Sequence, residues 1–200
     1  MKHIATVVLM AVMTIPTAAV HAANYNFISG DYFNTSATDG SDSGTGYALN
    51  FSHSVFADKM FISGRFEHHS LDYGSYYGGD FVNVVSAKFG YHLALSRATD
   101  LVLAVNCLHS REKSMYGTYT PYIVECGPEA GIRSRFSDRF EFDAFAYGNR
   151  VVESATADSA ISVGLLYDVG GGLAVGAEYL QTSSFFSNSR QWTFEVRWDY

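Results

Sequence analysis

The chain has 200 residues, with 13 Lys or Arg and 20 Asp or Glu, which give a formal net charge of −7. This length fits a single domain, and the acidic balance without a basic patch argues against nucleic acid as a partner. Mean hydropathy is close to zero. That average does not exclude a membrane-spanning barrel, because lipid-facing and lumen-facing residues cancel in it.

The first residues have the pattern of an export signal. Lys2 supplies a positive start, the stretch 4–19 is apolar, and small residues end at Ala22. The alternative, an anchoring helix, is disfavoured because the stretch is short and contains Pro16. No later stretch approaches the roughly 18 to 20 apolar residues that a spanning helix needs. The predicted organisation is a signal peptide over 1–22 and a single domain over 23–200.

The rest of the chain contains repeated segments of strand length. A strand that crosses a membrane needs roughly 9 to 11 residues, and segments near this length recur along the chain. We predict an all-β, antiparallel, up-and-down transmembrane barrel of ten strands, with eight as the alternative count. The predicted strands cover about 25–34, 46–56, 60–70, 81–92, 100–110, 121–135, 139–150, 159–169, 173–182 and 190–200.

The connections between these segments alternate between long and short. The long ones are rich in Gly, Ser, Tyr and acidic residues, and the short ones lie around Asp58, Ser96, Ser137 and Gly171. Outer-membrane barrels have short periplasmic turns and longer outside loops. An even strand count then predicts that both termini are periplasmic, in the outer membrane of a Gram-negative bacterium.

The last strand carries the strongest alternation. Successive side chains of a strand point to opposite faces. One face would present Trp192, Phe194, Val196, Trp198 and Tyr200, and the other Thr193, Glu195, Arg197 and Asp199. This pattern, ending on an aromatic residue, predicts lipid outside and a charged lumen inside. We also expect this strand to be the segment that the barrel-assembly machinery contacts.

The middle strands show the same division with three misfits. Outward positions such as Val163 and Val175 carry no charge, although Phe27 falls on the lumen side and His53 on the lipid side. Pro128 cannot donate to a ladder and predicts a bulge or a strand end. The alternative fold is a soluble β-sandwich, whose outward faces should be polar.

The inward positions hold charged residues of both signs. Charges that cannot face lipid must pair across the lumen, because an unpaired buried charge is costly. The alternatives are a structural network that fills the barrel and a selectivity filter or proton path. We favour the network, since eight strands leave an interior just filled by side chains. The predicted members are Arg65, Glu67, Lys88, Glu125, Glu129, Arg133, Glu141, Asp143, Glu178, Glu195 and Arg197, with Arg135 if its strand keeps phase.

Cys107 and Cys126 are the only cysteines, and they flank one long connection. In an antiparallel hairpin around it they fall nearly opposite each other and on the same face. Directly opposed residues have Cα atoms about 4.5 to 5.5 Å apart, which a disulfide accepts. An oxidising periplasm would allow the bond to form. We predict a cross-strand disulfide, with two free thiols as the alternative.

Catalytic and metal-binding patterns are weak. His68 and His69, like His109 and Ser110, are adjacent on a strand and so point to opposite faces. They cannot converge as a nucleophile and its base. The acidic segment 39–43 lacks the spacing of a calcium loop. We therefore predict no enzyme, no cofactor and no metal.

Four segments resemble a known family: YNFISGDY, SRATDLVLAV, GPEAGIRSRFSDRFEFDAF and EVRWDY. They are similar to the small outer-membrane β-barrel proteins of Xanthomonas and Stenotrophomonas, within the OmpA/OmpX-like group. The resemblance implies outer-membrane location and no catalytic residues. Asp31 stands where the family pattern has a second glycine, and the cysteine pair is not part of that pattern.

These observations predict a non-enzymatic outer-membrane barrel with a charged, largely filled lumen that serves envelope structure or surface interaction. Its expected partners are outer-membrane lipid, lipopolysaccharide and a surface partner of unknown identity. The alternative is a narrow, porin-like passive channel, and an enzyme at the outer rim ranks third. Surface contacts would use aromatic loop residues such as Tyr73, Tyr76, Tyr77, Tyr116 and Phe185.

Overall fold

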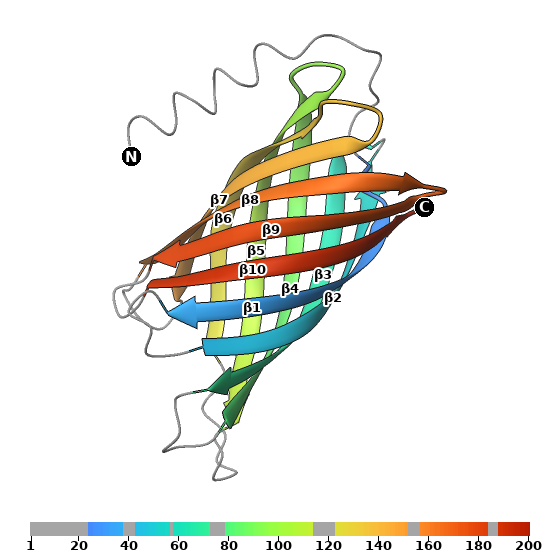
Figure 1. The fold of residues 1–200 in the computed structure, drawn as a ribbon. Coiled ribbons are helices and arrows are strands. Elements are labelled where there is room, and N and C mark those ends of the chain that lie inside the picture. Colours follow the sequence, from blue (N-terminus) through green and yellow to red (C-terminus); the bar gives the residue numbers. More distant parts are fainter. Residues whose placement is uncertain are drawn as a thin grey trace.

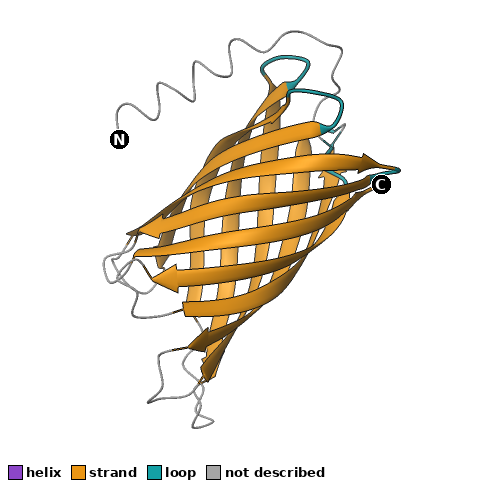
Figure 2. Ribbon diagram, in the orientation of Figure 1, coloured by secondary structure: helices purple, strands orange, loops and turns teal. Residues whose placement is uncertain are grey.

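The protein is a closed antiparallel barrel of ten strands (Figures 1 and 2). The computed structural model describes residues 24–37, 43–56, 58–72, 79–113, 123–151, 157–183 and 188–200. The strands are β1 (Phe27–Ala37), β2 (Ser43–Val55), β3 (Met60–Asp72), β4 (Gly79–Ala94), β5 (Thr99–Lys113), β6 (Ile123–Arg135), β7 (Phe140–Val151), β8 (Ala157–Gly170), β9 (Leu173–Ser183) and β10 (Asn188–Asp199). The predicted all-β class and the count of ten are confirmed.

The signal peptide predicted over 1–22, residues 39–42 of the acidic segment and the aromatic loop residues lie outside the described residues. Across the described ranges, no helix has the length and apolarity needed to cross a membrane.

Each strand pairs with its neighbour in sequence, and β1 pairs with β10 to close the cylinder. That last ladder runs from Phe27 opposite Asp199 to Ala37 opposite Ser189 without a break. Closure leaves no sheet edge, so backbone groups along the wall can be satisfied without water. The four short turns lie at the same end as Tyr200, and we call this the short-turn end (Figure 2).

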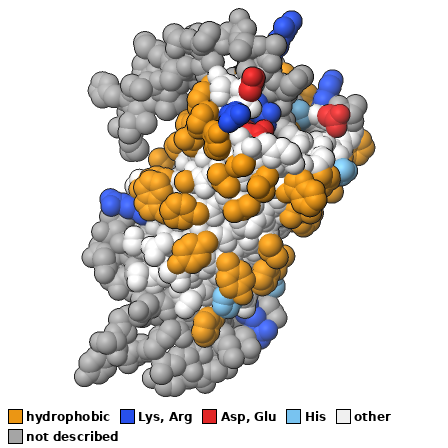
Figure 3. Space-filling view, turned by 45° about the vertical axis from the view of Figure 1, so that its right-hand side comes forward, with side chains coloured by type: hydrophobic (Ala, Val, Ile, Leu, Met, Phe, Trp, Pro, Cys, Tyr) orange, Lys and Arg blue, Asp and Glu red, His pale blue; other side chains and the backbone are white. Residues whose placement is uncertain are grey.

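Side chains alternate between the outer wall and the lumen. In β10, Trp192 and Trp198 are 54% and 63% exposed, whereas Thr193 and Arg197 are 3% exposed. Hydrophobic side chains lie in patches over the visible outer wall between its two ends (Figure 3). The alternation predicted for this strand is therefore confirmed, and the lumen receives its polar residues.

The three misfits have structural explanations. Phe27 does point inward, where its ring lies 5.1 Å from the Arg197 guanidinium carbon. His53 is exposed on the outer wall at the short-turn end, with its ring 6.3 Å from that of Tyr200. Pro128 interrupts the β6–β7 ladder, which has no residue pairs between Cys126 and Glu129.

Every strand has at least one bound that differs from the prediction by one to three residues, and the difference at the first strand matters for the lumen. The first strand begins at Phe27 rather than at residue 25, so Tyr25 precedes the ladder. Its side chain is nevertheless 4% exposed, because it turns into the lumen instead of following the wall. A periodic pattern cannot indicate such a residue, since it belongs to no strand.

Large aromatic rings fill parts of the lumen above glycines of the wall. A Cβ atom on Gly90 would lie 2.2 Å from the ring of Phe61, and one on Gly131 would lie 2.3 Å from Phe145. These glycines are needed for the close approach of a ring to the backbone, not for an unusual φ. The interior is thus occupied by side chains, as expected for a narrow barrel.

Cys107 and Cys126 form a disulfide between β5 and β6. They are register partners with Cα atoms 4.1 Å apart. The bond lies directly beside the gap that Pro128 leaves in the ladder on the other side of β6. It therefore holds β6 to one neighbour where the hydrogen bonds to the other neighbour are missing.

We predict that Cys107→Ala with Cys126→Ala lowers the free energy of unfolding by about 3 kcal/mol, as expected for a bridge that closes a short loop. The closed segment spans a sequence separation of 19 residues. Urea unfolding of the protein in lipid vesicles measures the loss. Reductant should lower the stability of the wild type to that of the double variant and leave the variant unchanged; equal stability in all four conditions would contradict the role.

Candidate functional site in the barrel lumen

The short-turn end of the lumen holds an ionic cluster around Glu141. Its carboxylate lies 3.0 Å from Arg197, 3.5 Å from Arg133 and 3.6 Å from Arg135. Arg197 also pairs with Asp199 at 2.9 Å. Glu141 and Arg197 are both 3% exposed. Strands β6, β7 and β10, which are not all neighbours in the wall, are thereby tied together across the interior.

An aromatic layer packs beside this cluster. The ring of Tyr25 stacks on Phe61 at 5.0 Å and on His92 at 4.3 Å. The Arg133 guanidinium carbon lies 5.1 Å from the centre of the Tyr25 ring. The Tyr25 hydroxyl donates a hydrogen bond to the Asp100 carboxylate at 3.2 Å. Burial raises the pKa of this hydroxyl well above its usual value, so it stays protonated as the donor.

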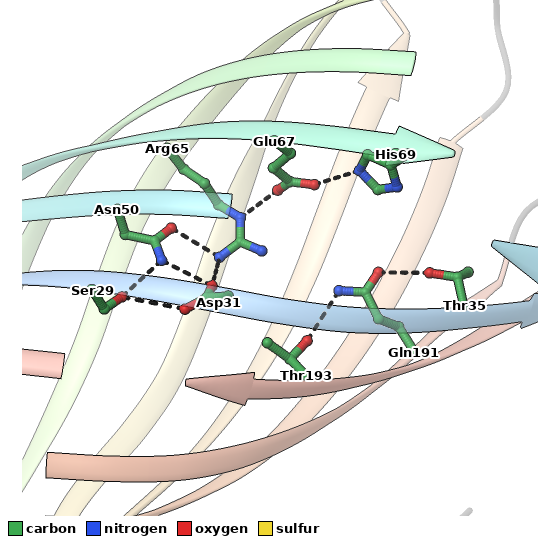
Figure 4. Close-up of polar contacts among 9 residues, drawn as sticks. All are labelled: Ser29, Asp31, Thr35, Asn50, Arg65, Glu67, His69, Gln191 and Thr193. Carbon is green, nitrogen blue, oxygen red and sulfur yellow. Dashed lines mark hydrogen bonds and ion pairs between the residues drawn. The ribbon is translucent and has the colours of Figure 1, made fainter. Parts of the chain in front are cut away.

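A second polar network occupies the lumen further along β1, β2 and β3 (Figure 4). Arg65 forms ion pairs with Asp31 and Glu67, and it donates to Asn50 at 2.8 Å. Glu67 in turn contacts His69 at 2.7 Å. This chain of contacts satisfies each charge by a neighbour of opposite sign or by a polar group, as a buried network requires.

The remaining predicted lumen residues divide into two groups. Lys88 on β4 pairs with Glu129 on β6 at 2.7 Å. Asp143, Glu178 and Glu195 lie on lumen-facing positions of β7, β9 and β10 and form no ion pair within the described ranges. Glu125 also has lumen parity and interacts with another group.

A cavity of about 350 Å³ lies between the aromatic layer and Thr182 and Gln191. Tyr25 and Arg133 line one side of it. Its charged lining consists of six carboxylates and three cations: Asp31, Glu67, Glu129, Asp143, Glu178, Glu195, Arg65, Lys88 and Arg133. The carboxylates of the lining outnumber its cations, so the formal charge of the cavity is negative.

The rim histidines do not form a catalytic group. His69 points into the lumen toward Glu67, whereas His68 lies on the outer wall, 2.8 Å from the Asn83 side chain. Exposed His109 shares the outer face with His68, and Ser110 has the opposite parity. Among the described residues, no three His, Cys, Asp or Glu side chains are arranged to hold a metal ion.

Four functional residues were not predicted from the pattern. Tyr25 precedes its strand, and His92 and Asp100 are isolated lumen residues whose contact, at 3.6 Å, joins the two ends of the β4–β5 turn. Asp31 has lumen parity but no neighbour in sequence that reveals Arg65 as its partner. For His92, Asp100 and Asp31, the available signal in the sequence was a polar residue at a lumen-facing position of a strand.

Comparison with known proteins identifies the fold rather than a family. No family model matches the chain, and no curated protein matches it. Solved structures do match, and each similarity is at low identity. An outer-membrane channel from Pseudomonas putida F1 is 9% identical with a TM-score of 0.60, covering 92% of this chain and 99% of the other.

Two further barrels are similar. The translocator domain of the autotransporter NalP from Neisseria meningitidis is 10% identical with a TM-score of 0.54, covering 100% of this chain and 96% of the other. Neisserial surface protein A is 10% identical with a TM-score of 0.50, covering 87% of this chain and 96% of the other. The chain therefore has the fold of the outer-membrane β-barrels.

We predict that Glu141→Gln destabilises the barrel by about 3 to 5 kcal/mol, because removing one partner of a buried ionic cluster leaves the others uncompensated. Three arginines would lose their shared carboxylate. Urea unfolding in vesicles measures the change. Glu178→Gln is the matched control and should cost nothing, since Glu178 has no ion pair within the described ranges; similar losses in both variants would argue against the cluster.

Proposed function

We propose that the chain is a non-enzymatic outer-membrane barrel whose lumen is closed, and that it serves envelope structure or surface interaction. The observation that carries this proposal is the layer across the short-turn end, where Tyr25, Phe61, Glu141 and Arg197 are all at most 5% exposed. Such a layer supports a lumen that is closed to water at this end, and therefore a barrel that does not conduct at rest.

The proposed setting is the outer membrane of a Gram-negative bacterium, with the short-turn end and both termini in the periplasm. The apolar outer wall supports contact with lipid, and the outer leaflet would add lipopolysaccharide. The strand from Trp192 to Tyr200 is the proposed contact for the barrel-assembly machinery. Membership of the small barrel family of Xanthomonas and Stenotrophomonas, and the identity of a surface partner, belong to this proposal as well.

Recording from planar bilayers tests the closed lumen. We predict that purified wild type inserts without producing discrete current steps, because the layer of buried side chains spans the lumen. A porin added to the same bilayers is the positive control. Discrete steps from the wild type, altered in size by Arg133→Ala, would contradict the proposal and favour a channel.

The second candidate function is a narrow passive channel. The cavity of about 350 Å³ favours it, because it interrupts the filled interior with space and with more carboxylates than cations. A channel would require the layer at the short-turn end to open. The bilayer recording separates the two candidates.

A substitution on the outer wall tests the lipid contact. We predict that Val163→Arg lowers the stability of the barrel in vesicles by about 2 to 4 kcal/mol, because a charge would face the middle of the bilayer. Val163 is 45% exposed and lies near the middle of β8. Gln181→Arg, at the outer end of β9, should cost about 0 to 1 kcal/mol. Equal costs at the two sites would place the wall in water.

A further inference from the structure

Tyr25 is the one residue of the closing layer that does not come from a strand. Every other member of the layer is held by ladders on both sides, as Phe61 and Glu141 are. Tyr25 is held by its side chain, through two ring stacks and one hydrogen bond to Asp100. It is therefore the member whose removal disturbs the wall least.

The short segment that carries Tyr25 is attached to the rim by the next residue. Asn26 accepts a hydrogen bond on its side chain from the backbone of Ser54 at 2.8 Å, and on its carbonyl from the backbone of Tyr200 at 3.1 Å. These bonds fix the point from which Tyr25 enters the lumen. They do not involve the phenol ring, so they remain when the ring is removed.

The ring of Tyr25 also forms part of the cavity wall. The closing layer therefore borders the cavity on one side, and the ring of Tyr25 lies in the layer at that border. Truncating the side chain would join the cavity to the short-turn end through the volume that the ring occupies. The Arg133 guanidinium, 5.1 Å from the ring, would lie at the side of that opening, held by its ion pair with Glu141 at 3.5 Å.

The charge of the cavity determines which ions such a path would carry. Arg65 and Lys88 pair with carboxylates of the lining, whereas Arg133 shares Glu141 with Arg135 and Arg197. Within the described ranges, Asp143 on β7 and Glu178 on β9 form no ion pair, and both are register partners of Gly164 on β8. A Cβ atom on Gly164 would lie 2.5 Å from the Asp143 carboxylate. Because Gly164 has no side chain, both carboxylates can face the same part of the lumen.

A lumen with low-dielectric walls and excess charge of one sign concentrates counter-ions. The carboxylates of Asp143, Glu178 and Glu195 all line the cavity. The excess formal charge of the lining is negative, so small cations are favoured over anions in the cavity.

We propose that Tyr25 is a stopper that closes a cation-selective path through the lumen. The proposal rests on the proposed function as an outer-membrane barrel, to which it adds a removable closure and an ion preference. Withdrawal of one aromatic side chain would turn a closed structural barrel into a narrow pore for small monovalent cations.

The experiment compares Tyr25→Ala with Tyr25→Phe in planar bilayers containing KCl. Phe keeps the ring stacks and loses only the hydrogen bond to Asp100, so Tyr25→Phe should remain silent like the wild type. Tyr25→Ala should produce discrete current steps. Under a KCl gradient its reversal potential should indicate a K⁺ over Cl⁻ permeability ratio on the order of tenfold, at the low end of charge focusing in a cleft.

The origin of the selectivity is tested in the Tyr25→Ala background. Asp143→Asn with Glu178→Gln should bring the permeability ratio close to one. Asp58→Asn with Asp138→Asn is the matched control, because it removes the same charge from two exposed turn residues. That control should keep the cation preference.

Each outcome decides a different part of the proposal. Vesicle flotation and an intact Cys107–Cys126 bond show that a variant has inserted and folded. A folded but silent Tyr25→Ala overturns the stopper and leaves the closed barrel standing, and conduction by the wild type overturns both. Conduction that is anion-selective, or equally cation-selective in both double variants, overturns the role of Asp143 and Glu178. Failure of the wild type to enter vesicles overturns the proposed function itself.

Discussion

The hydrogen-bonded closure of β1 on β10 is the constraint on which the rest of the structure depends. A sheet that faces hydrocarbon cannot leave backbone donors and acceptors exposed along an edge. The unbroken pairing from Phe27 to Ala37 against β10 removes that edge. Once the sheet is closed, each residue has only an outer or an inner position, and the ionisable residues of the wall have to share the interior.

The small radius of a ten-stranded barrel then forces those residues into contact. Glu141 meets arginines from β6 and β10, and Arg65 meets acids from β1 and β3. Desolvating such clusters costs free energy, and their main contribution is to the specificity of the register, since a slip would separate charges that meet only in this register. Phe61 and Phe145 fill the space between the clusters over glycines of the wall.

The lumen is consequently uneven along its length. The short-turn end is closed by packing and ion pairs, while the middle retains a cavity whose carboxylates outnumber its cations. A purely structural barrel would gain stability from balancing these charges. The excess of negative charge at Asp143, Glu178 and Glu195, together with a closing residue outside the ladder, supports the proposal of a path that can open.

The sequence by itself determined the fold class, the strand number and the face of nearly every strand residue, because alternation with period two is a local property that Trp192 to Tyr200 display openly. It also predicted the Cys107–Cys126 bond, since a hairpin sets the register of adjacent strands. Only the tertiary structure decided which inward charges meet, because Glu141 and Arg197 are 56 residues apart and come together through closure and strand tilt. It alone also placed Tyr25 in the lumen, since a residue before a strand has no periodicity to follow.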